Sequence, residues 1–124
     1  MRDVVICQPL RTPVGRFGGV FRDLDANTLA TGLLTELVDR TGLTGRDVDD
    51  VVLGQGSPSG EGPAIGRIAA PDSPLGIDVP GMQLDRRCGS GLQAIITGAR
   101  PVASGGMDPV VGGGVESLRR VEFH

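Results

Sequence analysis

Short apolar runs along this chain alternate with longer stretches in which apolar residues recur at helical spacing. Four runs are mostly apolar and are bounded by proline, glycine or charged residues, which is typical of strands. They lie at residues 4–7, 51–53, 82–85 and 109–111. Because their apolar residues largely follow one another instead of alternating with polar ones, the pattern predicts a parallel sheet covered on both faces.

The first helical stretch covers residues 27–41, where apolar side chains recur three or four positions apart. We expect Asn27 to cap its start and Gly42 to cap its end. Thr44, followed three positions later by Asp47, resembles a capping box and predicts one further short turn.

Two more helical stretches contain prolines, which help to place their ends. Pro63 suits the first turn of a helix over residues 63–70, and we expect Pro71 to stop it. The third stretch covers residues 89–103, where Pro101 is expected to kink the helix or end it early. The elements follow the order β-α-β-α-β-α-β, which predicts a single α/β domain over residues 1–124 with helices on both faces of the sheet.

Composition narrows the classes of function. The 124 residues carry a formal net charge of −3, so the positive excess that nucleic acid or an anionic membrane would attract is missing. All 12 basic side chains are arginine, which excludes chemistry by a P-loop or Schiff-base lysine. No apolar run approaches the roughly 18 residues that cross a bilayer. The 2 cysteines lie far apart and match neither a metal-binding spacing nor a disulfide framework, so we expect a protein of the reducing cytoplasm.

Cys88 is the strongest candidate for chemistry. It stands where a strand ends and a helix begins, and Gly89, Ser90 and Gly91 follow it. A nucleophile on such a strand–turn–helix bend needs small neighbours, because the bend is tight and the nucleophile is exposed. Free N–H groups and the positive end of the helix dipole favour a thiolate there. The alternative is that Cys88 is a small buried hydrophobic residue, as most lone cysteines are.

The other candidate side chains have simpler interpretations. Cys7 lies inside an apolar run, and we expect it to be buried in the core. His124 is the last residue, and we expect a mobile terminal side chain that does not act as a base. Glu116 follows a glycine-rich strand end, where ligands often approach in α/β folds, but the pattern favours a solvated surface carboxylate.

Glycines and arginines elsewhere are weak signals of a phosphate site. Gly54, Gly56 and Gly60 follow a strand, but the third glycine comes one position too late for a dinucleotide-binding fingerprint. Scattered arginines on a net-negative domain are usually surface residues or partners of carboxylates. Those considered are Arg11, Arg16, Arg67, Arg86 and Arg87.

Four segments in order match one known pattern. They are residues 11–19 after the first predicted strand, residues 65–67 on the second predicted helix, residues 84–95 around Cys88, and residues 110–118 at the glycine-rich strand end. Together they resemble the thiolase family of acyl-CoA condensing and cleaving enzymes. The segment around Cys88 is similar to the one around the family's acyl-accepting cysteine. Asp85 departs from the pattern, because the family usually has Asn, Ser or Thr there.

The resemblance implies an acyl-CoA C-acyltransferase. In thiolases the matching cysteine is acylated by an acyl-CoA, and the thioester is then attacked by a carbanion from a second acyl-CoA, or by CoA in the reverse direction. Cys88 would be the acyl acceptor, and its backbone N–H would contribute to an oxyanion site. The expected partners are acyl-CoA and CoA, together with further copies of the chain in a homo-oligomer or a complementing C-terminal thiolase half. No separate cofactor or metal is implied, because CoA is part of the substrate.

The resemblance also implies that this chain is the truncated N-terminal domain of a thiolase-like fold. The family's catalytic histidine, second catalytic cysteine and oxyanion asparagine come from later sequence, so we expect the chain alone to be nearly inactive. Two alternatives stay open. One is a split subunit completed by a C-terminal thiolase half, and the other is a non-catalytic fragment that dimerises or binds a partner through an uncovered sheet and helix.

Overall fold

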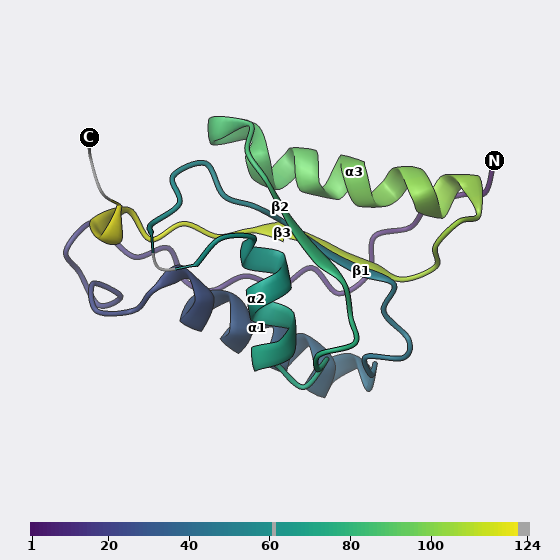
Figure 1. Cartoon of the computed structure of the whole chain (residues 1–124), viewed down its shortest axis with the longest axis horizontal. Helices are drawn as coiled ribbons and strands as arrows, with labels where there is room; N and C mark the ends of the chain where they lie inside the picture. Colours follow the sequence, from purple (N-terminus) through teal and green to yellow (C-terminus); the bar gives the residue numbers. More distant parts are fainter. Residues whose placement is uncertain (61, 122–124) are drawn as a thin grey trace.

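The computed structural model describes residues 1–60 and 62–121 and arranges them in three layers (Figure 1). Two single turns, η1 (Arg87–Gly89) and η2 (Leu118–Arg120), are 3-10 helix. The longer elements, in chain order, are α1 (Ala26–Thr41), β1 (Asp50–Gly54), α2 (Ile65–Asp72), β2 (Gly81–Leu84), α3 (Ser90–Ser104) and β3 (Val110–Gly114).

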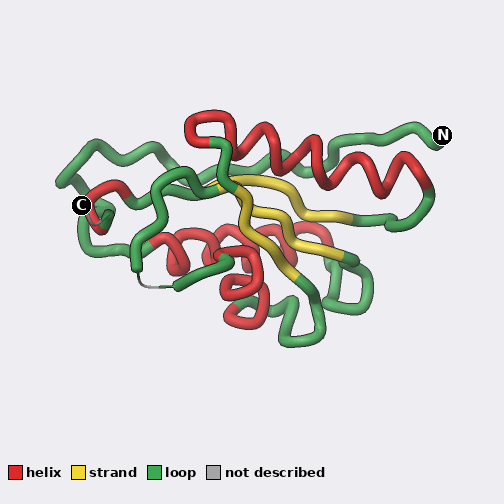
Figure 2. Tube along the Cα trace, turned by 45° about the horizontal axis from the view of Figure 1, so that its top comes forward, coloured by secondary structure: helices red, strands yellow, loops and turns green. Residues whose placement is uncertain are grey.

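The sheet is parallel and has the strand order β2-β1-β3. Val51 of the central strand pairs with Gly81 on one side and with Val111 on the other. Helix α3 covers one face of the sheet, and α1 and α2 cover the other (Figure 1, Figure 2). The predicted α/β class, with a parallel sheet between helices, is confirmed.

The core lies around β1, because this strand has a neighbour on each edge and a helix layer on each face. Val51 and Val52 are 0% and 2% exposed, and they point to opposite faces as neighbours in a strand do. Ala94 of α3 is fully buried as well. The main buried cluster joins β1 to α1 and α2, and it consists of Ala26, Ala30, Leu34, Val48, Val51, Leu53, Ile65, Ala69, Ala70, Leu75 and Val79.

Helix α1 has the predicted end but a different start. Gly42 caps its end in the left-handed conformation at φ 70° and donates its N–H to the carbonyl of Val38. The amino end is capped by Asp25, whose Oδ1 accepts the Thr28 N–H at 2.6 Å. The prediction of Asn27 as cap is wrong, because Asn27 is already helical and its side chain donates to Asp72 of α2 at 2.6 Å. The capping-box contact is confirmed by Asp47, which accepts the Thr44 N–H at 2.7 Å.

The prolines act differently from expectation. Helix α2 begins at Ile65, two residues after Pro63, because the side-chain oxygen of Gln83 on β2 accepts the Ile65 N–H at 3.1 Å and thereby places the helix start. Pro71 lies inside the last turn of α2. Pro101 does not end α3 at once, since three further residues continue the helix to Ser104.

The predicted first strand is absent, so over the described residues the sheet has three strands where four were expected. No strand is assigned to residues 4–7, and Val5 and Ile6 are 76% and 77% exposed. The chain is anchored just before this run by Arg2, which donates to the carbonyl of Val102 at 3.0 Å and pairs with Asp108 at 2.6 Å. A β-branched run becomes a strand only when a neighbouring backbone pairs with it, and this condition is not in the run itself.

Candidate active site

Cys88 lies on the bend between β2 and α3, as predicted. The strand ends at Leu84, η1 carries Cys88 through one tight turn, and α3 begins at Ser90. The thiol is free and exposed, which excludes the alternative of a buried hydrophobic residue. We call residues 85–90 the elbow.

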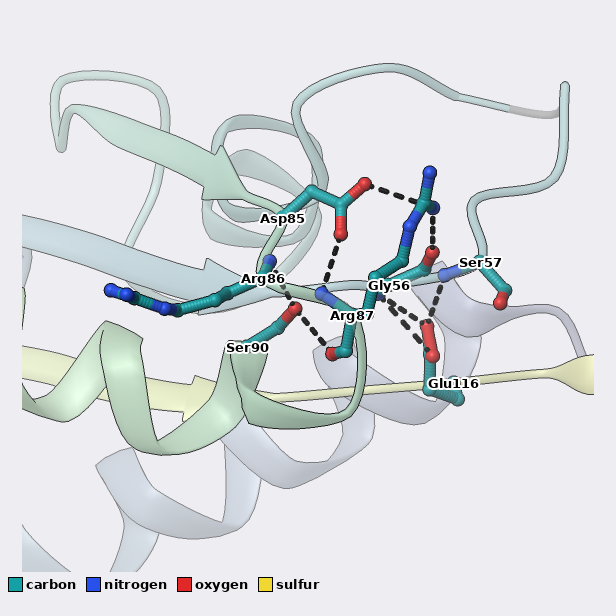
Figure 3. A network of polar contacts seen from close by, with 7 residues as sticks. All are labelled: Gly56, Ser57, Asp85, Arg86, Arg87, Ser90 and Glu116. Carbon is teal, nitrogen blue, oxygen red and sulfur yellow. Dashed lines mark hydrogen bonds and ion pairs between the residues drawn. The ribbon is translucent and has the colours of Figure 1, made fainter.

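Ser90 stabilises the elbow through two hydrogen bonds of its hydroxyl group. Its hydroxyl accepts the Arg86 N–H at 2.8 Å and donates to the carbonyl of Arg87 at 2.7 Å (Figure 3). The residue is 4% exposed, and both bonds are partly buried. A serine at a helix start is the only sequence signal of this role, and the sequence predicts Ser90 only as a small neighbour of Cys88.

Arg87 has an unusual backbone conformation immediately before Cys88. Its φ is +49°, in the left-handed region that non-glycine residues rarely adopt. Asp85 supports it twice, because one carboxylate oxygen accepts the Arg87 N–H at 2.8 Å and the other pairs with the Arg87 guanidinium at 3.1 Å. The aspartate that departs from the family pattern therefore has a defined role in the bend. The neighbouring Arg86 donates to Gln93 on α3 at 2.6 Å.

Glycines let the amino end of α3 sit directly on the ends of the strands. A Cβ at Gly54 would lie 2.3 Å from the backbone carbon of Ser90, and one at Gly56 would lie 2.8 Å from the carbonyl oxygen of Arg87. Side chains at these two positions would push the helix away. The loop that gave only a weak phosphate-binding signal thus serves as a close-packed support for the elbow.

Glu116 is exposed, as the sequence favoured, but its carboxylate also has backbone partners. It lies just beyond β3, and its Oε1 accepts the N–H groups of Gly56 at 2.9 Å and Ser57 at 3.1 Å (Figure 3). The sequence indicated its place at a strand end, but it contained no sign of the partner loop 60 positions away.

The second cysteine has a different setting. Cys7 is also free and exposed, so the expectation that it packs in the core is wrong, because the segment that carries it forms no strand. His124 lies outside the described residues. In the part of the chain that the structure describes, no group of three or more potential metal ligands is found. Over those same residues, no helix is long and apolar enough to cross a membrane.

These features define the class of protein: an α/β domain that presents an exposed cysteine at the amino end of a helix, on a bend tied to two strand ends. The family model for the thiolase N-terminal domain matches residues 4–123, and the chain belongs to the thiolase family.

Relatives and a solved structure agree with this assignment. The chain is 41% identical to the beta-ketoadipyl-CoA thiolase of Pseudomonas putida over 99% of its own length and 31% of that protein's. It is 39% identical to an acetyl-CoA acetyltransferase of Pseudomonas aeruginosa, covering 95% of this chain and 30% of the relative. The crystal structure of the Bacillus anthracis acetyl-CoA acetyltransferase matches with a TM-score of 0.87 and 33% identity, over 93% of this chain and 29% of that one. The chain therefore spans about a third of the length of the curated relatives it matches.

Proposed function

We propose that this chain carries the acyl-accepting cysteine of a thiolase-type acyl-CoA C-acyltransferase. The observation that supports this most directly is the exposed Cys88 at the amino end of α3, inside a segment that belongs to the thiolase family. The relatives named as thiolase and acetyl-CoA acetyltransferase support acyl-CoA thioesters as the substrate class.

In the proposed reaction, the Cys88 thiolate attacks the carbonyl carbon of an acyl-CoA. The tetrahedral intermediate collapses, the bond from the carbonyl carbon to CoA sulfur breaks, and CoA leaves as a thiolate that takes up a proton. The acyl group is then bound to Cys88 as a thioester, which a carbanion from a second acyl-CoA, or CoA in the reverse direction, would attack. The Cys88 backbone N–H is the proposed oxyanion donor.

We also propose that the 124 residues alone turn over slowly. The only histidine of the sequence is its last residue, His124, so no other imidazole is available to move protons at Cys88. Missing general acid–base catalysis lowers a rate by about 10²- to 10⁴-fold.

The test separates acylation from turnover. The chain is incubated with acetyl-CoA, digested and analysed by mass spectrometry for an acetyl group on each cysteine. We expect the acetyl group on Cys88 and not on Cys7, and its loss in Cys88→Ser but not in Cys7→Ser. Acetylation of both cysteines at equal rates, or of neither, contradicts the proposal. Thiolysis of acetoacetyl-CoA at the rate of a full-length thiolase would contradict the proposed slow turnover.

A second function, partner binding, is favoured by the outer face of α3. Leu92 is 67% exposed, and Ile95 and Ile96 are 39% and 40% exposed. Such a face suits a second copy of the chain or a complementing thiolase half. Under this alternative Cys88→Ser leaves partner binding intact, whereas loss of all detectable activity in that variant contradicts it.

A further inference from the structure

The carboxylate of Glu116 connects the end of β3 to the loop after β1. Its Oε1 accepts two consecutive backbone N–H groups, from Gly56 at 2.9 Å and Ser57 at 3.1 Å. Because a single oxygen holds two consecutive N–H groups, its position limits where the loop can lie.

The same loop contacts the elbow. The carbonyl of Gly56 accepts the Arg87 Nη1 at 2.7 Å, and the Gly56 backbone packs so closely on Arg87 that an added Cβ would come within 2.8 Å of its carbonyl oxygen. Figure 3 shows the resulting sequence of contacts from Glu116 through Gly56 to Arg87. A shift of the loop is therefore transmitted to Arg87.

Arg87 precedes Cys88 and holds a left-handed backbone conformation, with φ +49°. Such a conformation persists only where surrounding contacts enforce it. Gly56 and Asp85 supply the contacts to its guanidinium, and Glu116 holds Gly56.

We propose that Glu116 is a positioning residue for Cys88. It acts through the loop after β1 and through Arg87, and it does not contact the substrate that Cys88 would attack. The inference deepens the proposed function, since it rests on Cys88 as the nucleophile. What matters is the reach of an oxygen acceptor to Gly56 and Ser57, not the negative charge.

The experiment measures iodoacetamide alkylation of Cys88 relative to Cys7 in the whole chain, by mass spectrometry of peptides. Glu116→Gln keeps the reach and an acceptor oxygen but removes the charge, whereas Glu116→Asp keeps the charge and shortens the side chain. We expect the ratio of rates to stay near the unsubstituted value in Glu116→Gln. In Glu116→Asp and Glu116→Ala it should fall by about threefold or more. Asp47→Ala is the control, because it removes another exposed carboxylate that accepts a backbone N–H away from the elbow.

Two results overturn the proposal. An unchanged ratio in both Glu116→Asp and Glu116→Ala shows that the elbow does not depend on this residue. A reduced ratio in Glu116→Gln with a normal ratio in Glu116→Asp shows that the charge acts on the thiol and not the reach. If Glu116→Ala fails to fold, the Gln and Asp variants decide alone. Alkylation needs no acyl-CoA, so failure of the acetylation test with a normal response here contradicts the proposed function and leaves the role of Glu116 standing.

Discussion

The residues of the elbow solve one physical problem, which is that a tight bend leaves backbone groups without strand or helix partners. Unpaired polar groups are costly when water is excluded, so side chains must replace the missing partners. Ser90 does this for Arg86 and Arg87, and Asp85 does it for the N–H of Arg87. Cys88 is exposed between these fixed points, and its position follows from theirs.

Ser90→Ala tests the most buried of these contacts. It leaves the Arg86 N–H without its acceptor and removes one of two donors to the Arg87 carbonyl, which also accepts the Ser90 backbone N–H, so we expect the free energy of unfolding to fall by about 1–3 kcal/mol in urea titrations. Ser104→Ala is the matched control, because its hydroxyl donates to the Pro101 carbonyl at an exposed helix end. Equal losses in the two variants would show that Ser90 has no special place in the bend.

The setting of Cys88 predicts a difference from Cys7, although both thiols are exposed. Only Cys88 lies at a helix amino end, where N–H groups and the helix dipole stabilise an anion. Near neutral pH we expect iodoacetamide to modify Cys88 several times faster, a difference that should disappear in denaturant. Equal rates in the folded chain would remove the physical basis for choosing Cys88 as the nucleophile.

At the scale of the elements, capping side chains help to fix where a helix begins. Asp25 starts α1, and hydrogen bonds from the side chain and backbone of Thr28 lower the pKa of its carboxyl below the ordinary value. Asp25→Ala should destabilise the fold by about 1 kcal/mol at neutral pH. Thermal unfolding measures the loss, and Asp25→Asn is the control that keeps a capping oxygen.

The same cap predicts a pH dependence with a definite sign. Because the pKa of Asp25 is lowered in the folded state, its ionised form contributes stability that is fully present above the ordinary carboxyl pKa. The contribution is lost as the pH falls through the lowered pKa. The difference between the unsubstituted chain and Asp25→Ala should therefore shrink below about pH 4. A difference that grows in acid would contradict the cap.

Two glycines of α1 and β1 predict opposite effects of the same substitution. Gly54→Ala places a Cβ 2.3 Å from the Ser90 backbone, so α3 must move, and we expect a loss of roughly 1–3 kcal/mol or more. Gly32 lies in α1 with nothing within 4 Å of its would-be Cβ, so Gly32→Ala should stabilise by about 0.5–1 kcal/mol. Urea titrations of both variants measure the contrast, and a stabilising Gly54→Ala would disprove the close approach.

At the scale of the whole molecule, the apolar surface is unevenly covered. The α1–α2 side encloses the main buried cluster, whereas Leu92 and Ile96 remain open on the outer face of α3. Large exposed apolar faces favour association. We expect concentration-dependent self-association in sedimentation-velocity experiments, weakened in Leu92→Glu. Val14→Glu is the control, because Val14 is an exposed apolar residue far from Leu92 in the sequence. An equal effect there would indicate non-specific association.

The sequence was sufficient for features whose cause is local. Apolar runs located β1, β2 and β3, helical spacing located α1, α2 and α3, and Gly42 marked a helix end correctly. It was insufficient to predict that α2 begins after Pro63, that Asn27 does not cap α1, and that residues 4–7 form no strand. Gln83 of β2 places the start of α2, Asp72 binds Asn27, and a strand requires a partner.

For the candidate site, the sequence by itself located the bend that carries Cys88, because small residues follow this cysteine where a strand ends and a helix begins. Tertiary structure alone decided that Glu116 reaches Gly56 and Ser57, and that Gly54 and Gly56 support the helix start. The physical reason is distance along the chain. Hydrogen bonds and close packing between residues tens of positions apart arise only when parallel strands bring their carboxyl ends to one edge of the sheet.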